Sequence, residues 1–257
     1  MREGAASPEP FAAMGRLRIV TRVAAMLLLF VACLPFYYLW RLKGPHNPWP
    51  RIFLGGVARL AGVTVRVSGE RVRQGAILIA NHVSWIDIPA VASASGAAFV
   101  GHDGLSSVPL VRWLCALNDT VLVARHDRRS VRRQVEQVRE AIRDTGALAI
   151  FPEGTTSDGT GLLAFKSSLL SAIDPLPQGI AVQPVLLDYG PEAAGIAWIG
   201  EEHGLDNFKR ILARGPRLEV LVHFLPPLAG EALADRKSMA AAARTAILGE
   251  LKRGGQG

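Results

Sequence analysis

Seven short apolar runs follow residue 62, and they constrain the fold more than any other feature of the chain. Several are apolar throughout, as a strand must be when both faces of its sheet are covered. Helical patterns separate them, and the clearest, at 129–144, carries one apolar stripe of valines and an isoleucine. This order predicts an α/β fold with a largely parallel central sheet flanked by helices. The expected strands are 63–68, 76–80, 97–101, 120–124, 147–151, 181–187 and 218–224.

An uncharged run of 18 residues, 23–40, comes before this region. As a helix it would reach about 27 Å, just short of the ~30 Å hydrocarbon core of a bilayer. Tyr37, Tyr38 and Trp40 close the run, as aromatic residues do at a membrane interface. Basic residues flank both sides, so charge does not fix an orientation. A single span and a monotopic helix both fit, and the aromatic end disfavours a cleaved signal peptide.

The chain therefore divides into three predicted parts. Residues 1–13 are small and polar and are expected to be a disordered tail. Residues 44–50, GPHNPWP, break the first helix, and 51–62 has the pattern of a short second helix. We expect 14–62 to form a membrane-associated helical hairpin and 63–257 to form the α/β domain.

The charge balance points to an anionic partner. Lysine and arginine total 29 against 22 acidic residues, which gives a net charge of +7. Basic proteins bind polyanions, either nucleic acid or an anionic membrane surface. No nucleic-acid motif is present, so anionic membrane lipids are the predicted partner. The two cysteines, Cys33 and Cys115, form no disulfide framework or zinc spacing, which indicates buried thiols in a reducing compartment.

Polar residues follow the expected strand 76–80 in the stretch NHVSWID. Ligands of such sheets bind beyond the carboxyl ends of the strands. His82 can accept a hydroxyl proton near neutral pH, and Asp87 behind it can hold the tautomer. On one helix, a spacing of five residues would point the two side chains in different directions. We therefore expect His82 in a loop and Asp87 in the first turn of the following helix. The alternative is a structural histidine with Asn81 or Ser84 capping a helix.

A second group, FPEGTTSDG, follows the expected strand 147–151. Glu153 places a carboxylate at the exit of the strand, and Gly154 shapes a tight turn. The backbone N–H groups of Gly154, Thr155 and Thr156 could bind an anion or an oxyanion. The alternative is a plain loop with a capping threonine.

Two cations could bind a phosphate or a carboxylate. Arg125 ends the run TVLVAR, and Lys166 lies in LLAFKSS. Each could equally be a solvated surface charge. No GxSxG frame surrounds Ser84, which disfavours a serine hydrolase. His82, Asp87 and Glu153 have no second histidine at ligand spacing, so no metal site is predicted.

The combination of these blocks resembles the glycerolipid acyltransferase family, which includes the lysophosphatidic acid acyltransferases. NHVSWID resembles the first block of that family, NHxxxxD, and FPEGTTS resembles the third, FPEGTRS. TVLVAR resembles the second block and AVQPVLL the fourth, and all four occur in the family's order. The resemblance implies acyl transfer from acyl-CoA or acyl-carrier protein to a lysolipid hydroxyl, with no other cofactor.

The resemblance also implies roles for single residues. His82 matches the family's base and Asp87 its partner. Glu153 and Gly154 match residues thought to help hold the acceptor, and Arg125 matches the arginine of the second block. Thr156 departs from the pattern, because the family has an arginine there that is commonly assigned to the acceptor phosphate.

That departure leaves two acceptors open. The first is 1-acyl-sn-glycerol-3-phosphate, whose acylation gives phosphatidic acid, and the alternative is a lyso-ornithine lipid. Arg125 and Lys166 could still serve a phosphate. An inactive membrane-binding module is the alternative of another class, which the intact His82, Asp87 and Glu153 disfavour. We expect the enzyme at the cytoplasmic membrane with the α/β domain facing the cytosol, where acyl thioesters are found.

Overall fold

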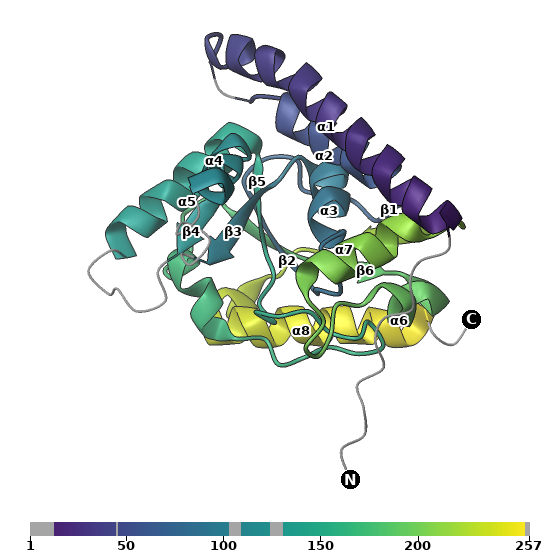
Figure 1. The fold of residues 1–257 in the computed structure, drawn as a ribbon. Coiled ribbons are helices and arrows are strands. Elements are labelled where there is room, and N and C mark those ends of the chain that lie inside the picture. The colour runs from purple at the N-terminus through teal and green to yellow at the C-terminus, as the bar shows by residue number, and fades with distance from the viewer. Residues whose placement is uncertain (1–12, 45, 103–108, 124–130, 255–257) are drawn as a thin grey trace.

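A seven-stranded sheet forms the centre of the computed structural model, which describes residues 13–44, 46–102, 109–123 and 131–254 (Figure 1). The strand order is β1-β7-β6-β2-β5-β3-β4, and every neighbouring pair is parallel except β6 and β7. The predicted α/β fold with a largely parallel sheet is therefore confirmed. The strands are β1 (Val63–Ser68), β2 (Ala76–Ala80), β3 (Ala98–His102), β4 (Val121–Val123), β5 (Ala147–Ile150), β6 (Ala181–Asp188) and β7 (Leu218–Phe224).

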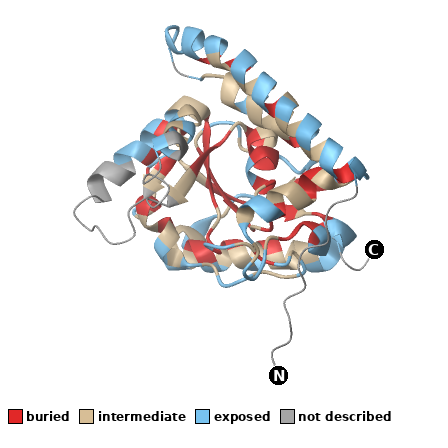
Figure 2. Cartoon of the chain, in the orientation of Figure 1, coloured by how far each residue is buried: buried red, intermediate tan, exposed pale blue. Residues whose placement is uncertain are grey.

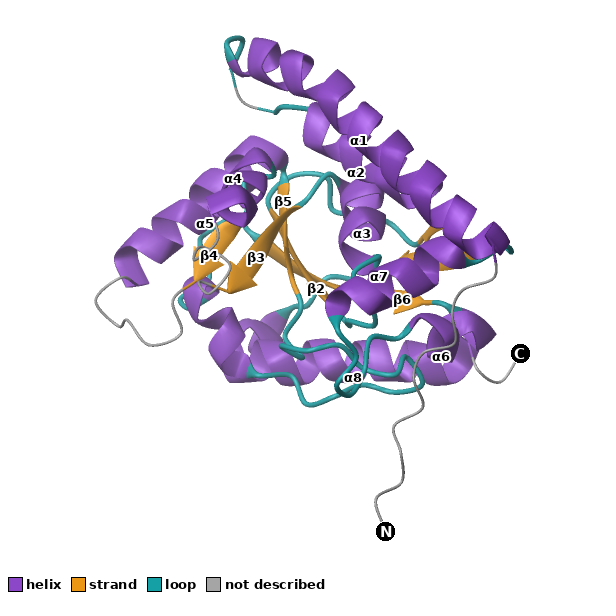
Figure 3. Ribbon diagram, in the orientation of Figure 1, coloured by secondary structure: helices purple, strands orange, loops and turns teal. Residues whose placement is uncertain are grey.

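Helices cover both faces of the sheet (Figure 3). One buried cluster joins the sheet to α1, α2, α3 and α7, and a second joins it to α5, α8 and a 3₁₀ segment at Ser167–Ile173. The helices are α1 (Ala13–Arg41), α2 (Trp49–Leu60), α3 (Asp87–Ser95), α4 (Pro109–Leu117), α5 (Val131–Thr145), α6 (Ala193–Ile196), α7 (Gly204–Ala213) and α8 (Arg236–Gly254).

The central strands explain why the apolar runs are continuous. All five residues of β2 are buried, and they divide alternately between the two clusters. Ala76, Leu78 and Ala80 face the first cluster, whereas Ile77 and Ile79 face the second. Alternate side chains of a strand point to opposite faces, so a strand covered on both sides must be apolar throughout. Figure 2 shows these buried strands in the middle of the molecule.

The N-terminal helix α1 is longer than the uncharged run that predicted it. Its 29 residues span about 43 Å at 1.5 Å per residue. It packs against α2 and α7, and Met26 belongs to the first buried cluster. Much of its remaining apolar surface is exposed, including Leu27, Leu28 and Val31. Among the described residues, α1 is the one helix long and apolar enough to cross a membrane.

Two arginines of α1 attach it to the C-terminal end of α7. Arg22 Nη1 donates hydrogen bonds to the carbonyl oxygens of Leu212 at 2.9 Å and Arg214 at 3.1 Å. Arg18 Nη1 donates to the carbonyl oxygen of Ala213 at 3.4 Å. The last carbonyl groups of a helix lack partners within the helix and carry partial negative charge, so guanidinium groups stabilise them.

The structure shifts several predicted boundaries. Strand 97–101 lies one residue later, and the second helix begins at Trp49, inside the predicted break, because proline is tolerated in a first turn. β7 runs antiparallel to β6, a reversal that the sequence pattern did not predict. Residues 1–12 of the predicted tail, 1–13, and Arg125 lie outside the described residues, and Ala13 is the first residue of α1.

Candidate active site

Three parallel neighbours in the sheet, β2, β5 and β6, end at the same edge. The chain that follows each of them carries a polar side chain, which is buried in two cases and partly exposed at His82. His82 comes two residues after β2, Glu153 three residues after β5, and Tyr189 directly after β6. The edge of the sheet therefore brings together residues from distant parts of the sequence, as the sequence pattern predicted for the first two.

His82 and Asp87 are in direct contact. His82 Nδ1 lies 2.7 Å from Asp87 Oδ2. His82 lies in the loop after β2, and Asp87 opens α3, which is the arrangement that the five-residue spacing requires. Asp87 Oδ2 also accepts the backbone N–H groups of Val83 at 2.6 Å and Ser84 at 3.0 Å. Asp87 Oδ2 therefore accepts from two backbone N–H groups and is also placed to accept a hydrogen bond from His82 Nδ1.

The backbone of His82 is held on both sides by the loop after β5. Its N–H donates to Glu153 Oε1 at 2.8 Å. Its carbonyl oxygen accepts from the backbone N–H of Ser157 at 2.7 Å and from the Ser157 hydroxyl at 3.0 Å. The second oxygen of Glu153, Oε2, accepts the N–H of Leu163 at 2.9 Å. Directional hydrogen bonds therefore join the loop after β5 to the loop after β2 at the backbone of His82.

Glu153 is 1% exposed, and burial is the main cause that raises its pKa above the ordinary value. The hydrogen bonds from His82 and Leu163 lower the pKa part of the way back. Both carboxylate oxygens therefore have backbone donors. In this geometry Glu153 holds the chain around His82, and its role in holding the acceptor stays a prediction.

An apolar cavity of about 750 Å³ opens beside His82. His82, Gly154 and Thr155 are among its lining residues, as are the polar residues Asn118, Thr120 and Ser168. The remaining wall is mostly apolar and includes residues from three helices and one strand. These are Phe30 of α1, Phe53 of α2, Leu114 of α4 and Phe99 of β3. The His82 ring stacks on Phe151, which also lines the cavity, with ring centroids 4.4 Å apart. A cavity of this size and lining suits a long apolar ligand.

The other predicted site residues are placed as follows. Gly154 adopts a left-handed backbone with φ of 69°, and a Cβ there would meet Lys166 Nζ at 3.2 Å. The Gly154 N–H donates within its own turn, to Phe151, at 3.2 Å. Lys166 is exposed next to this turn, and Thr155 is exposed at the cavity. The Thr156 hydroxyl donates to the carbonyl oxygen of Trp198, so it is already engaged.

The predicted alternative of a helix cap does not occur. The N-cap position of α3 is Ile86, without a side-chain cap. Asn81 instead pairs with the backbone of Leu187 in β6, through bonds of 3.0 and 2.7 Å. The Ser84 hydroxyl donates to Asn207 Oδ1 of α7 at 3.4 Å. Both residues therefore join the loop after β2 to its neighbours.

Sequence reasoning missed several residues of the site. Tyr189 is buried, and its hydroxyl donates to Asp87 Oδ1. The signal for it was available, because Tyr189 follows a predicted strand at the same sheet edge. Phe30, Phe53 and the residues of α4 gave no local signal, since an apolar helix face reveals only that something covers it. Within the described residues, no group of three histidine, cysteine, aspartate or glutamate side chains could hold a metal ion.

The site therefore consists of a histidine held by a carboxylate and an apolar cavity that the same histidine lines. The Acyltransferase family matches residues 64–188 of the sequence. A lyso-ornithine lipid O-acyltransferase of Rhodobacter capsulatus is 30% identical over 250 residues, which cover 91% of this chain and 90% of that protein. The protein therefore belongs to the acyltransferase family, and the predicted resemblance is confirmed.

Further relatives support this assignment. A lyso-ornithine lipid O-acyltransferase of Pseudomonas aeruginosa is 33% identical over 247 residues, which cover 91% of this chain and 93% of that protein. A 1-acyl-sn-glycerol-3-phosphate acyltransferase of Neisseria gonorrhoeae is 35% identical over 119 residues, or 46% of each chain. The crystal structure of the 1-acyl-sn-glycerophosphate acyltransferase PlsC from Thermotoga maritima has the same fold. Its TM-score is 0.59 at 18% identity, with 92% of this chain and 97% of that chain covered.

Proposed function

We propose that the protein transfers an acyl chain from an acyl thioester, acyl-CoA or acyl-carrier protein, to the free hydroxyl of a lysolipid. One observation carries the proposal: His82 Nδ1 is fixed by Asp87 at 2.7 Å, while the ring lines an apolar cavity of about 750 Å³. The names of the relatives support the lysolipid acceptor. An inactive membrane-binding module would have no need of this geometry.

The reaction needs no enzyme nucleophile. His82 Nε2 takes the proton of the lysolipid hydroxyl while that oxygen attacks the thioester carbonyl carbon. Asp87 stabilises the imidazolium that forms. When the tetrahedral intermediate collapses, the C–S bond breaks, and the leaving thiolate takes the proton back from His82. The apolar cavity holds an acyl chain during these steps, with the thioester carbonyl near His82 and Thr155.

For the acceptor we propose a lyso-ornithine lipid. Thr156 replaces the family arginine that is assigned to a phosphate, and its hydroxyl is bonded to Trp198 rather than free for a ligand. Two relatives that are at least 30% identical over 91% of this chain are named for that acceptor. Lysophosphatidate, placed first by the sequence resemblance, is the second candidate, because Lys166 Nζ near Gly154 offers a cation to a phosphate.

The acceptor is tested by measuring kcat/KM with a labelled acyl thioester and each of the two lysolipids. We expect the native protein to have a higher kcat/KM for the lyso-ornithine lipid. Thr156→Arg should raise the kcat/KM for lysophosphatidate by about ten- to a hundredfold. This range corresponds to a charge-assisted bond of roughly 1.5–3 kcal/mol. Lys166→Ala should lower the kcat/KM for lysophosphatidate and leave that for the lyso-ornithine lipid unchanged. A native preference for lysophosphatidate that Thr156→Arg does not change would exclude the proposed acceptor.

We also propose that α1 lies along the membrane surface on the cytosolic side, rather than crossing the bilayer. Arg22 binds α7 near one end of the uncharged run. Near the other end, Asn47 Nδ2 donates to the carbonyl oxygen of Tyr37 at 3.1 Å, and Trp113 Nε1 donates to the Tyr38 hydroxyl at 3.2 Å. A perpendicular span would carry one of these ends across ~30 Å of hydrocarbon, away from the domain.

Substitution of the exposed face of α1 tests this membrane contact. Leu28 and Val31 are 72% and 65% exposed and lie one turn apart. The double variant Leu28→Ser, Val31→Ser should bind vesicles more weakly, because buried apolar area drives interfacial helix binding. The matched control is Ile199→Ser, Leu205→Ser, which changes exposed apolar residues elsewhere in the chain. Tags at both termini of the native protein should be accessible from the cytosolic side only, and their appearance on opposite sides would establish a span.

A further inference from the structure

Asp87 has a buried partner that the proposed mechanism does not use. Oδ2 of Asp87 is shared among His82, Val83 and Ser84. Oδ1 accepts the hydroxyl of Tyr189, and among the described residues no other donor reaches this oxygen. Asp87 is fully buried and Tyr189 is 4% exposed, so water does not readily replace that bond. A buried carboxylate oxygen without a donor is costly, which makes this contact consequential.

We propose that Tyr189 is a positioning residue for the reaction: its hydroxyl fixes the rotation of the Asp87 carboxylate, so that Oδ2 stays in line with His82 Nδ1, and it shares the negative charge of that carboxylate. This inference rests on the proposed acyl transfer. It assigns Tyr189 no contact with substrate, because Tyr189 is absent from the cavity wall that His82 lines.

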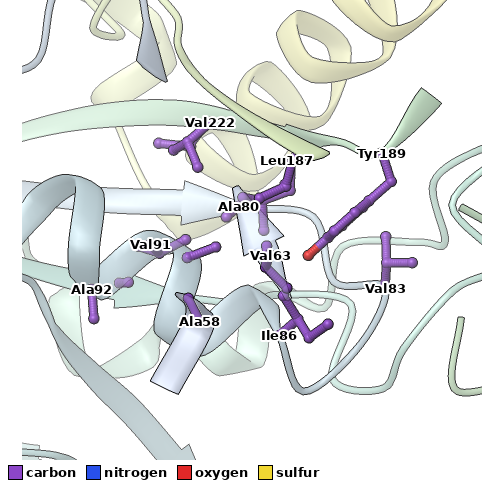
Figure 4. Close-up of a cluster of buried hydrophobic side chains, with 14 of the residues drawn as sticks. Ala58, Val63, Ala80, Val83, Ile86, Val91, Ala92, Leu187, Tyr189 and Val222 are labelled. Atoms are coloured by element: carbon purple, nitrogen blue, oxygen red, sulfur yellow. The ribbon is translucent and has the colours of Figure 1, made fainter. Parts of the chain in front are cut away.

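The geometry explains why one oxygen bond matters. The terminal torsion of an aspartate is broad, so a carboxylate held through one oxygen can pivot about it. A donor on each oxygen removes that freedom, and Oδ2 then stays in line with His82 Nδ1. Tyr189 itself is held firmly: its ring belongs to the first buried cluster with Val83, Ile86 and Leu187. Figure 4 shows the ring among these side chains with its oxygen directed into the cluster.

The electrostatics act in the same direction. Burial and the charge of Asp87 raise the pKa of Tyr189 well above its usual value, so the phenol keeps its proton and can donate throughout an ordinary assay range. The other titratable groups that face this pair are His82, from the loop after β2, and Glu153, from the loop after β5. Asp188, next to Tyr189, instead accepts the backbone N–H of Gly190 at 2.8 Å.

The first test is Tyr189→Phe, which keeps the ring and removes the hydroxyl. We expect kcat to fall roughly tenfold, the scale of a lost hydrogen bond to a charged group, and KM for both substrates to stay unchanged. With one donor fewer, Asp87 holds an imidazolium more strongly. The acidic limb of the kcat/KM–pH profile should therefore move to higher pH. Tyr38→Phe is the matched control, because it removes a tyrosine hydroxyl that accepts a hydrogen bond from Trp113.

The second test uses 3-fluorotyrosine at position 189, which keeps the hydroxyl and makes it a stronger donor. The acidic limb should then move to lower pH, opposite to Tyr189→Phe. A purely packing role would lower thermal stability in the phenylalanine variant without moving the limb in either direction, and that result would overturn the inference.

The native protein and His82→Ala separate this inference from the proposed function. If native acyl transfer depends on His82 but the Tyr189 variants do not shift the acidic limb of the kcat/KM–pH profile, only the positioning role of Tyr189 fails. If the native protein shows no His82-dependent acyl transfer, the proposed function and the positioning role fail together.

Discussion

The surroundings of His82 are polar on one side and apolar on the other. Its backbone and its Nδ1 face a polar network in which Asp87, Glu153 and Ser157 supply bonds of 2.7 to 3.0 Å. Its ring also borders an apolar cavity whose wall includes Phe30, Phe53 and Phe151. Directional bonds fix a position, because they weaken steeply when their angles change. Apolar contacts are not directional, so they hold a chain without fixing each atom. Under the proposed function, the polar network positions His82 as the base and the apolar cavity accommodates the substrate.

The largest expected effect comes from removing the residue that both sides share. His82→Ala should reduce acyl transfer by about 10²–10⁴-fold, the usual loss for a positioned base, without a matching loss of thermal stability. His223→Ala is the control, because His223 lies in β7 and pairs with Glu250 at 3.5 Å. Near-normal turnover in a stably folded His82→Ala protein would contradict the mechanism.

The next effect tests the polar side alone. In Glu153→Gln the amide nitrogen cannot accept a hydrogen bond, so one of the N–H groups of His82 and Leu163 loses its acceptor. We expect the free energy of unfolding to fall by about 1–3 kcal/mol and kcat to fall more than KM changes. Chemical denaturation and steady-state kinetics measure the two effects. Unchanged stability would show that the loop after β5 does not depend on this carboxylate.

The same variant has a predicted pH dependence. The pKa of Glu153 is raised in the folded protein, chiefly by burial, so its contribution to stability is fully present below the unfolded pKa. That contribution is lost as pH rises through the folded pKa. The stability difference between native protein and Glu153→Gln should therefore be largest at and below pH 4.5, the ordinary glutamate value, and shrink as pH rises above it. A difference that grows with pH would show that the raised pKa is wrong.

The smallest effect tests the apolar side. Phe53 lines the cavity and contacts the Phe30 ring edge-on, with centroids 5.4 Å apart. Phe53→Ala should shift preference toward longer acyl donors, by up to about fourfold in kcat/KM for each methylene newly buried at ~0.8 kcal/mol. The control is Phe208→Ala, which removes an aromatic ring that packs on Trp85 away from the cavity. If both variants keep the native chain-length profile, this wall does not contact the acyl chain.

The sequence predicted the polar side better than the apolar side. β1, β2 and β7 lie at their predicted boundaries, because apolar runs and flanking turns are local signals. His82 and Asp87 could be paired from their spacing and from the rule that ligands bind at strand ends. The same rule places Tyr189 at this edge, but its contact with Asp87, 102 residues away in the chain, is visible only in the structure. The role of Glu153 also required the structure, since a carboxylate that accepts two backbone N–H groups looks the same in sequence as one that binds a ligand.

The contribution of α1 to the cavity bears on how the protein can be shortened. Phe30 belongs to the helix with the exposed apolar surface, yet it forms part of the wall beside the reacting histidine. Trimming that helix to obtain a more soluble protein would remove part of the wall of the cavity that we propose for the acyl chain. If such a truncated protein were inactive, the result would therefore not show that the enzyme requires a membrane for activity. Solubility should instead be engineered by replacing outward-facing side chains such as Leu28 one at a time, with the helix kept in place.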